Sequence, residues 1–524
     1  MSINAGGDSA ATRREFLVKT SAGAAALVGG SMLGMPAVRA ATAAGGTGRA
    51  IALTHVTVID ATGARPRPDM TVIITGERIT ALGRSAEVPI PRGATTLDLT
   101  GRFLIPGLCD MHVHSAAAEI NLPLYLANGV TTVREMWGQP FHHEWRDEVE
   151  NGSLPGPRSV IAGTLIDGSP ELWNDQAPRP GAPIVVTNET EARRAVRQVK
   201  REGADFVKVY SRLSRAAFHG IADEARRQGL SFGGHCPDVV PIAEAAAAGM
   251  RSFEHLDGVW WSTSARRHEI ERALAAITID PADAYGSWFR QIGVLEWKAA
   301  TSYDPRKADG LFARLRRSRS WQVPTLTMLQ RLDLPGGADD PRLRYVVREE
   351  AEFWKQWADA RDRERTPEQV AQHRELFQRR LRLVGAMHDA GLPILAGTDT
   401  GTTYIFPGFS LHDELALLVR AGLSPLRALQ AATSEPARYL GQEHSRGTVQ
   451  RGKLADLVVL DADPLADIRN TRRIHAVLTR GRLIDAGRRE RMLADVERAA
   501  NPPGATPTGG RPAMAGCGCH GRAF

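Results

Sequence analysis

The chain has 524 residues, a formal net charge of +7 and four cysteines. Part of the positive excess lies in the first 40 residues, and elsewhere no Lys/Arg run alternates with aromatic residues, which excludes nucleic acid as a partner. Two cysteines lie in apolar stretches and two near the C-terminus, which is no disulfide framework.

Residues 1–40 have the order of features of an export signal. Arg13 and Arg14 precede a small-residue apolar run, and residues 38–40 suit signal peptidase. Paired arginines in this setting indicate the twin-arginine (Tat) export machinery. The run is too short and too rich in Gly and Ala to remain as a membrane span. We expect a mature protein that is periplasmic or secreted and free of the membrane; the alternative is a disordered basic tail before an apolar helix.

Residues 41–107 and 443–490 share alternating apolar and polar residues with turn signals between them, as in "TVIITGERITAL" and "GKLADLVVLDAD". This pattern is typical of half-buried antiparallel strands. We therefore expect the two ends of the mature chain to build one small β-sandwich domain together.

The middle of the chain, residues 108–442, alternates short apolar runs with helical patterns, as βα repeats do. Eight runs are recognisable: "GRFLIPGLCDMHVH", "GVTTVREM", "RSVIAG", "ADFVKVY", "SFGGHC", "RSFEHL", "WQVPTLTM" and "PILAGTD". Eight parallel strands predict an α/β fold with a closed (β/α)8 TIM-like barrel. Long Arg-rich connections near residues 262–320 and 330–391 predict helical insertions. An open doubly wound sheet is the alternative, but no Gly-rich phosphate loop follows any run.

Residues 491–524 are expected to form a flexible C-terminal tail, since they end in the Gly-rich stretch "GCGCHGRAF". Cys517, Cys519 and His520 in this stretch are ligand types that suit a soft metal. The sequence leaves their role open.

Polar side chains close several of the eight apolar runs. They are His112 and His114 in the first, Lys208 in the fourth, His235 in the fifth, His255 in the sixth and Asp399 in the eighth. In a barrel the carboxyl ends of the strands converge on one mouth. Taken singly, each residue reads as an ordinary core histidine, strand-end lysine or turn aspartate. Their joint occurrence in strand order predicts a site for divalent metal, because imidazole and carboxylate are its usual ligands.

With these residues the sequence resembles the amidohydrolase superfamily. That family has His-x-His on strand one, a carboxylated lysine on strand four, histidines on strands five and six, and aspartate on strand eight. The stretches "LIPGLCDMHVH", "GADFVKVY", "GGHC", "FEHL", "AGTDTG" and "GTVQRGKLADLVVLD" are similar to its blocks and span nearly the whole mature chain. With a lysine in the fourth run, the sequence resembles more narrowly the binuclear subgroup, which includes dipeptidase-like and imidazolonepropionase-like hydrolases.

The resemblance implies two divalent metal ions per chain. The ligands would be His112, His114 and Asp399 for the first ion, His235 and His255 for the second, and Lys208, as a CO2-derived carbamate, for a bridge between them. Zn²⁺ is the expected metal, although Mn, Co and Fe suit the same ligands. Asp399 is further expected to act as general base and acid, and His235 or His255 to polarise the carbonyl.

Six other side chains are candidates for contact with the substrate: Tyr210, His412, Arg134, Trp137, Trp173 and Trp260. The tryptophans follow predicted strands and could form an aromatic pocket at the mouth, or else pack their loops onto the barrel. Arg134 could pair with a substrate carboxylate or form a salt bridge that supports the barrel. Tyr210 could donate a hydrogen bond or pack at the rim, and His412 could lie near the site or only begin a helix.

We therefore expect a hydrolase of an amide bond in a small peptide-like or N-acyl amino acid substrate, attacked by a metal-activated hydroxide. The same site could open lactones, cyclic imides or esters. A competing hypothesis is a non-catalytic periplasmic metal-binding protein, against which the complete ligand set argues. The leaving group and the formation of a homo-oligomer are left open, because one barrel hosts many chemistries.

Overall fold

The computed structural model describes residues 49–173 and 181–502 of the chain. The predicted export signal at residues 1–40 and the cysteine-containing end at residues 517–520 lie outside the described residues. No helix within the described ranges is long and apolar enough to cross a membrane.

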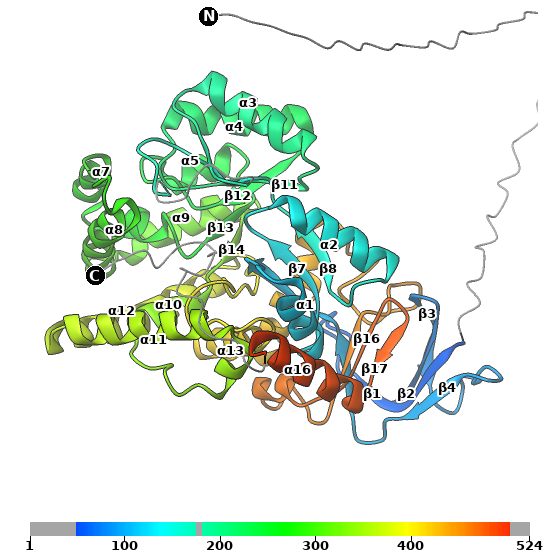
Figure 1. Cartoon of the computed structure of the whole chain (residues 1–524). Coiled ribbons are helices and arrows are strands. Elements are labelled where there is room, and N and C mark those ends of the chain that lie inside the picture. The colour runs from blue at the N-terminus through cyan, green and yellow to red at the C-terminus, as the bar shows by residue number, and fades with distance from the viewer. Residues whose placement is uncertain (1–48, 174–180, 503–524) are drawn as a thin grey trace, which may run out of the picture. The chain divides into compact units, whose positions relative to one another are not determined.

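The two ends of the described chain meet in one eight-stranded mixed sheet. Its strands are β1 (Ile51–Val58), β2 (Arg67–Thr75), β3 (Arg78–Arg84), β4 (Thr95–Asp98), β5 (Phe103–Pro106), β15 (Leu457–Leu460), β16 (Ile474–Thr479) and β17 (Arg482–Ile484). β15 pairs antiparallel with β5 and so joins the N-terminal strands to the C-terminal ones. Figure 1 shows β16 and β17 in the same part of the molecule as β1, β2 and β3. Alternate residues such as Leu53, Val72 and Val459 share one buried cluster. Both ends of the chain thus contribute to one sheet, as the sequence predicts.

Seven of the eight predicted parallel strands are present. One sheet, in the order β6-β7-β8, has β6 (Leu108–Val113), β7 (Val130–Glu135) and β8 (Arg158–Ile161). The other, in the order β10-β9-β11-β12-β13-β14, has β9 (Ile166–Asp167), β10 (Ile184–Val185), β11 (Phe206–Val209), β12 (Ser231–Gly234), β13 (Ser252–Glu254) and β14 (Trp321–Val323). The α/β class is confirmed, but the strand pairing of the described residues closes neither sheet.

The eighth predicted run, "PILAGTD", forms isolated bridges rather than a named strand. Ile394 pairs with Gln322, and Thr400, just beyond the run, pairs with Val113. Pro393 has no N–H to donate and Gly397 has no side chain to pack, and both weaken a strand. A further isolated bridge, Ala162–Phe206, lies between β8 and β11.

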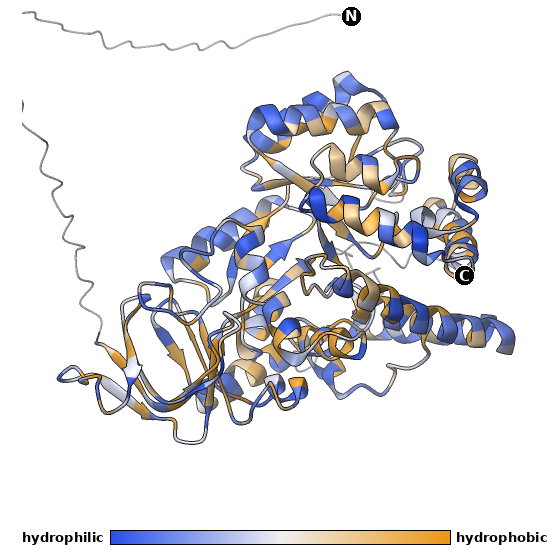
Figure 2. Cartoon of the chain, turned by 180° about the vertical axis from the view of Figure 1, so that it is seen from behind, coloured by the Kyte–Doolittle hydropathy of each residue, from blue (hydrophilic) through white to orange (hydrophobic). Residues whose placement is uncertain are grey.

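Helices separate the strands, as βα repeats require. They are α1 (Ala118–Ala127), α2 (Pro140–Asn151), α3 (Glu189–Arg201), α4 (Arg215–Gln228), α5 (Ile242–Ala247), α13 (Phe409–Arg420), α14 (Pro425–Ala431), α15 (Ser434–Tyr439) and η2 (Ile468–Arg472). In α3, Ala192, Val196 and Val199 are buried on one face, while charged residues cover the other (Figure 2). This spacing explains why the segment is a helix that packs on the core.

The two long connections are helical, as predicted. The first has α6 (Val259–Thr263), α7 (Arg267–Ala275), α8 (Ala284–Thr301) and α9 (Pro305–Arg317). The second has α10 (Leu326–Asp333), η1 (Pro341–Tyr345), α11 (Arg348–Glu364) and α12 (Pro367–Asp389). Thr366 and Gln369 form a capping box that starts α12.

The prediction of a flexible tail is wrong for its first residues. Helix α16 (Ala486–Ala500) is capped by Asp485, whose side chain accepts a hydrogen bond from the backbone of Arg488. Val496 and Ala500 are buried against α1. Their helical spacing gives α16 an apolar face, and this packing orders the segment.

Candidate metal centre

Four imidazoles and one carboxylate converge at the carboxyl ends of the parallel strands. His112 and His114 stand at the end of β6, His235 follows β12, and His255 follows β13. The ring centroids of His112 and His255 are 4.7 Å apart, those of His235 and His255 are 4.8 Å apart, and those of His112 and His114 are 5.3 Å apart. Asp399 approaches His112 and His114, so the structure brings these five predicted ligands together.

Several polar atoms in this cluster are buried and make no hydrogen bond to a described residue. They are Nε2 of His112, His114 and His235, Nδ1 of His114, and both carboxylate oxygens of Asp399. Leaving such an atom unsatisfied costs about 1–3 kcal/mol. Nε2 of His112 and of His114 lie 3.3 and 3.2 Å from Oδ1 of Asp399. A cation shared by His112, His114 and Asp399 would satisfy one such atom of each residue, so the three residues fit a divalent metal ion.

Hydrogen bonds from neighbouring side chains fix the orientation of three rings. Nδ1 of His112 lies 2.8 Å from Glu254 Oε2, Nδ1 of His235 lies 2.9 Å from Ser211 Oγ, and Nδ1 of His255 lies 2.7 Å from Thr325 Oγ1. Each ring is therefore held at its Nδ1 edge, which leaves Nε2 as the ligand atom.

The sequence analysis missed these three partners. Glu254 offers the clearest signal, since it directly precedes His255 at the end of an apolar run. Ser211 and Thr325 are ordinary hydroxyl residues after predicted strands, and no pattern distinguishes them from turn residues.

The backbone at the cluster is strained. His255, Thr325 and Asp399 have φ values of 58°, 46° and 62°, in the left-handed region that side chains with a Cβ rarely adopt. Each such residue costs on the order of 1–3 kcal/mol and persists only where its surroundings fix it, typically at a functional site.

The imidazoles of His112, His235 and His255 are held neutral. Burial lowers the pKa of His255 to about 3, and burial together with the charge of Lys208 lowers the pKa of His112 and of His235 well below the ordinary value. For Asp399, burial alone would raise the pKa, but His114, His255 and Lys208 outweigh it, so that its pKa lies below the ordinary value. Neutral imidazoles and an ionised carboxylate are the forms that bind a metal ion.

Lys208 belongs to the same cluster. Its side chain, on β11, is only 1% exposed, and its charge acts on His112, His235 and Asp399. Gly234 of the next strand makes room for it: a β-carbon there would come within 3.0 Å of Lys208 Cδ and 2.2 Å of the Val209 carbonyl oxygen. The sixth predicted ligand thus lies where the resemblance requires it.

Arg134 forms the supporting salt bridge, and it does not contact the substrate. It is fully buried, and its Nη2 donates to Glu254 at 3.0 and 3.1 Å, while Nε donates to the Met111 carbonyl at 2.6 Å. Nη1 donates to Tyr439 Oη at 3.0 Å. Because every nitrogen is engaged within the protein, none is left for a ligand. Arg134 instead positions the carboxylate that holds His112.

His412 does not reach the site. It lies in the first turn of α13, where Nδ1 is 3.0 Å from Thr471 Oγ1 and Nε2 is 3.1 Å from the Asn128 carbonyl oxygen. Both ring nitrogens have protein partners and the residue is buried, so the expectation of a substrate contact is wrong for this residue. The ring ties α13 to η2 and α1.

The buried His412 ring predicts a pH dependence of stability. Burial lowers its pKa to about 4, against about 6.5 in an unfolded chain. Above pH 6.5 the ring is neutral in both states, but between about pH 6.5 and 4 only the unfolded chain binds the proton. Acidification should therefore lower the unfolding free energy of the wild type by roughly 3 kcal/mol more than it lowers that of His412→Gln.

Urea unfolding of both proteins at pH 7.5 and 4.5 measures this difference. The exposed His268, changed to Gln, serves as control and should follow the wild type, since its side chain is 87% exposed. Parallel pH profiles for wild type and His412→Gln would contradict the assignment.

An aromatic cavity of about 630 Å³ adjoins the cluster and is lined by His235 and His255. Its apolar wall consists of Trp260, Trp261, Tyr285, Trp288, Phe289 and Trp297, from α6 and α8. Trp260 therefore lies where the sequence predicts. Tyr210 stacks on His235 with a 4.0 Å centroid distance, which places it beside the cluster.

Trp137 and Trp173 pack behind the cavity instead of lining it. Trp137 Nε1 donates to the Gly181 carbonyl at 2.9 Å, and Trp173 contacts Tyr210 and Tyr285 with centroid distances of 5.7 and 5.0 Å. The alternative that these tryptophans pack their loops is the one the structure supports. The sequence missed Tyr285 and Trp288, because they lie in an insertion far from any predicted strand end.

One cation in the cavity stands out. Arg365 donates from Nη1 to the Asp333 carbonyl at 3.1 Å and from Nη2 to the Leu332 carbonyl at 2.8 Å, and it forms no ion pair with a carboxylate of a described residue. Arg380, by contrast, pairs with Glu296 at 2.8 Å. Burial lowers the pKa of Arg365 only to about 10, so it keeps its charge at neutral pH.

Comparison with known proteins finds a match to one family model and solved structures with a similar fold. The Amidohydrolase family model matches residues 360–484. An adenine deaminase of Rubrobacter xylanophilus is 22% identical over 470 residues, which cover 87% of this chain and 60% of that protein. This chain therefore spans about 60% of the length of that curated relative.

Solved structures agree with this match. Bottromycin amidohydrolase has a TM-score of 0.66 and 23% identity over 87% of this chain and 91% of its own. A putative prolidase from Bifidobacterium longum has a TM-score of 0.59 and 25% identity over 86% and 99%. The family match and the similar folds support the amidohydrolase superfamily, the family that the sequence resembles.

Proposed function

We propose that this protein is a metal-dependent hydrolase that cleaves an amide bond in a peptide-like or N-acyl amino acid substrate with a bulky aromatic group. One observation carries the proposal: unsatisfied, buried ligand atoms of His112, His114, His235 and Asp399 lie beside an aromatic cavity. Similar proteins are named as an amidohydrolase and a prolidase, which supports an amide bond as the target.

The cluster suits two divalent ions. His112, His114 and Asp399 would hold one and His235 and His255 the other, with Lys208, as a carbamate formed with CO2, between them. When bound, such ions polarise the substrate carbonyl and lower the pKa of water. Zn²⁺ is the proposed metal because the donors are imidazole and carboxylate, and Mn, Co and Fe fit the same donors. The neutral imidazoles and the burial of Lys208 support this arrangement.

The chain's own residues would move the proton. Asp399 is fully buried and ionised, and its oxygens have no hydrogen-bond partner among the described residues. It can accept a proton from the attacking water and donate it to the leaving nitrogen, as a general base and acid must. His235 or His255, which line the cavity, would orient the carbonyl.

The cavity offers contacts for two chemical groups of the proposed substrate. Trp260, Tyr285 and Trp288 offer flat apolar surface for an aromatic group. Arg365 offers a guanidinium whose present partners are backbone carbonyls, so its charge remains available to a substrate carboxylate. An N-acyl aromatic amino acid or a dipeptide with an aromatic side chain combines these groups.

Replacing Arg365 with glutamine should raise the KM of such a substrate about 10- to 100-fold and change kcat little, since a charged hydrogen bond contributes about 1.5–3 kcal/mol. Steady-state kinetics on the carboxylate substrate and on its carboxamide analogue check this. Arg363→Gln, an exposed change in the last turn of α11, two residues before Arg365, is the control. An equal rise in KM for both substrates would contradict a carboxylate contact.

The proposal as a whole is tested by elemental analysis of the purified protein together with a panel of aromatic N-acyl amino acids, dipeptides, lactones, cyclic imides and esters. About two ions per chain with turnover of the amides would support it. Preferred turnover of lactones, imides or esters would keep the site but change the bond. Bound metal without turnover of any of them would favour a metal-binding protein.

We also propose that the parallel strands close into a (β/α)8 barrel flanked by a β-sandwich domain. The bridges Val113–Thr400, Ala162–Phe206 and Gln322–Ile394 support closure, because they connect β8 to β11 and connect β6 and β14 to the eighth run. The paired arginines near the N-terminus support export by the Tat machinery to the periplasm or the medium.

A further inference from the structure

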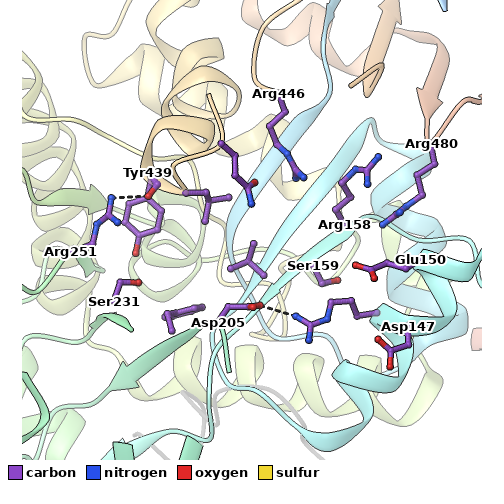
Figure 3. A pocket seen from close by; sticks show the side chains of 15 residues that line it. Asp147, Glu150, Arg158, Ser159, Asp205, Ser231, Arg251, Tyr439, Arg446 and Arg480 are labelled. Atoms are coloured by element: carbon purple, nitrogen blue, oxygen red, sulfur yellow. Dashed lines mark hydrogen bonds and ion pairs between the residues drawn. The ribbon is translucent and has the colours of Figure 1, made fainter. Parts of the chain in front are cut away.

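A second cavity, of about 510 Å³, lies at the opposite ends of the parallel strands from the metal centre. Ser159, Phe206 and Ser231, at the starts of β8, β11 and β12, line it together with Arg251, which directly precedes β13 (Figure 3). His235 and His255, two of the candidate metal ligands, follow the other ends of β12 and β13. This cavity is thus separate from the substrate cavity, and the proposed hydrolysis makes no use of it.

The second cavity is rich in arginine. Five line it, namely Arg146, Arg158, Arg251, Arg446 and Arg480, against three acidic residues, Asp147, Glu150 and Asp205. Arg146 pairs with Asp205 at 2.9 Å, and Arg158 pairs with Asp456 at 2.9 Å and Glu77 at 2.7 Å. These two arginines therefore have their charge balanced within the protein.

The charges of Arg446 and Arg480 are not balanced in this way. Neither forms an ion pair with a carboxylate of a described residue, and the Nε of each is buried without a hydrogen-bond partner among those residues. Within the described residues, the side chain of Arg446 donates a single hydrogen bond, a long one of 3.5 Å from Nη1 to Thr132 Oγ1. Buried guanidinium nitrogens without acceptors are costly, and an oxyanion would supply the acceptors.

Arg158, Arg446 and Arg480 also lie together on one side of the cavity (Figure 3). Burial and the charge of Arg158 lower the pKa of both Arg446 and Arg480, although Asp456 acts on both, and Glu77 and Glu150 on Arg480, in the opposite sense. The ion pairs of Asp456 and Glu77 are made with Arg158, so Arg446 and Arg480 still repel each other unless a further anion lies between them.

We propose that Arg158, Arg446 and Arg480 form a binding site for a small oxyanion, the phosphate or carboxylate group of a metabolite. Guanidinium groups bind such groups through paired hydrogen bonds. Asp147 and Glu150 line the same cavity and would repel a second anionic group placed near them. The site therefore favours a ligand with one anionic end and a neutral or cationic remainder.

Isothermal titration of the metal-loaded protein with inorganic phosphate and with acetate tests the proposal, with sodium chloride at equal ionic strength as blank. The double variant R446Q/R480Q should weaken the binding of the preferred anion at least about tenfold. R306Q, an exposed change on α9, is the matched control and should bind like the wild type. Binding of phosphate alone or of acetate alone identifies the group that the site prefers.

Thermal unfolding provides a readout that is independent of activity. The preferred anion should raise the unfolding midpoint of the wild type and of R306Q but not that of R446Q/R480Q. Without anion, the double variant should unfold no earlier than the wild type, because two mutually repelling charges are gone. Equal binding by all three proteins would overturn the proposal and would place the anion elsewhere, for instance on the metal ions. Absence of saturable binding to the wild type would also overturn it.

Discussion

Asp399→Asn should abolish nearly all hydrolysis, with kcat/KM reduced about 10⁴-fold, while the fold is retained. The change preserves the size of a fully buried side chain but removes the charge that faces His112 and His114 at 3.3 and 3.2 Å. A carboxamide cannot accept the proton of the attacking water, and general acid–base catalysis alone contributes 10²–10⁴-fold. The weakened metal site accounts for the rest of the loss.

The measurement is kcat and KM on the best amide substrate, together with metal content and the circular dichroism spectrum. Asp309→Asn is the control, since Asp309 is an exposed aspartate on α9 that undergoes the same chemical change. If Asp399→Asn retained metal and lost less than about tenfold in kcat/KM, Asp399 would not be the proton-transfer group.

Lys208→Ala should lower the metal content from about two ions per chain to about one and reduce kcat about 10²-fold or more. The side chain is 1% exposed and its charge acts on His112, His235, His255 and Asp399, so that its loss is felt by both halves of the cluster. Removal of the long side chain leaves a space beside Gly234. Added acetate or propionate should enter this space and restore part of the activity, because a carboxylate has the oxygens of a carbamate.

Rescue distinguishes a bridging ligand from a merely structural lysine. Lys208→Met, which fills the space, should lose activity equally and should not respond to acetate. Elemental analysis with and without added carboxylate follows the second ion directly. Unchanged metal content in both variants would exclude Lys208 from the metal centre, and the site would then hold the single ion of His112, His114 and Asp399.

The candidate ligand set was accessible from the sequence because it depends on local features. The histidines and Asp399 stand at the ends of short apolar runs, and consecutive βα units bring such ends to one face. His112 and His114 are one residue apart, and both reach Asp399 in the structure. The resemblance to the amidohydrolase superfamily rests on the same local stretches, which explains why it was confirmed.

The roles of Arg134, His412 and Trp137 could not be assigned in this way. Each follows or lies in a predicted strand or helix, but its partner comes from a distant part of the chain: Glu254 for Arg134, Thr471 for His412 and Gly181 for Trp137. A side chain that can bind a ligand can equally bind the protein, and only the tertiary contacts decide between the two.

The sequence by itself determined the candidate ligands at the strand ends, the α/β class and the contribution of both ends of the described chain to one sheet. These follow from hydrophobic periodicity and from residue type, which are local properties. Only the tertiary structure decided which aromatic residues line the cavity beside the cluster, which arginine there has no acidic partner among the described residues, and which arginines gather at the opposite strand ends. Cavities and charge balance arise from side chains that are far apart along the chain, so no local pattern records them.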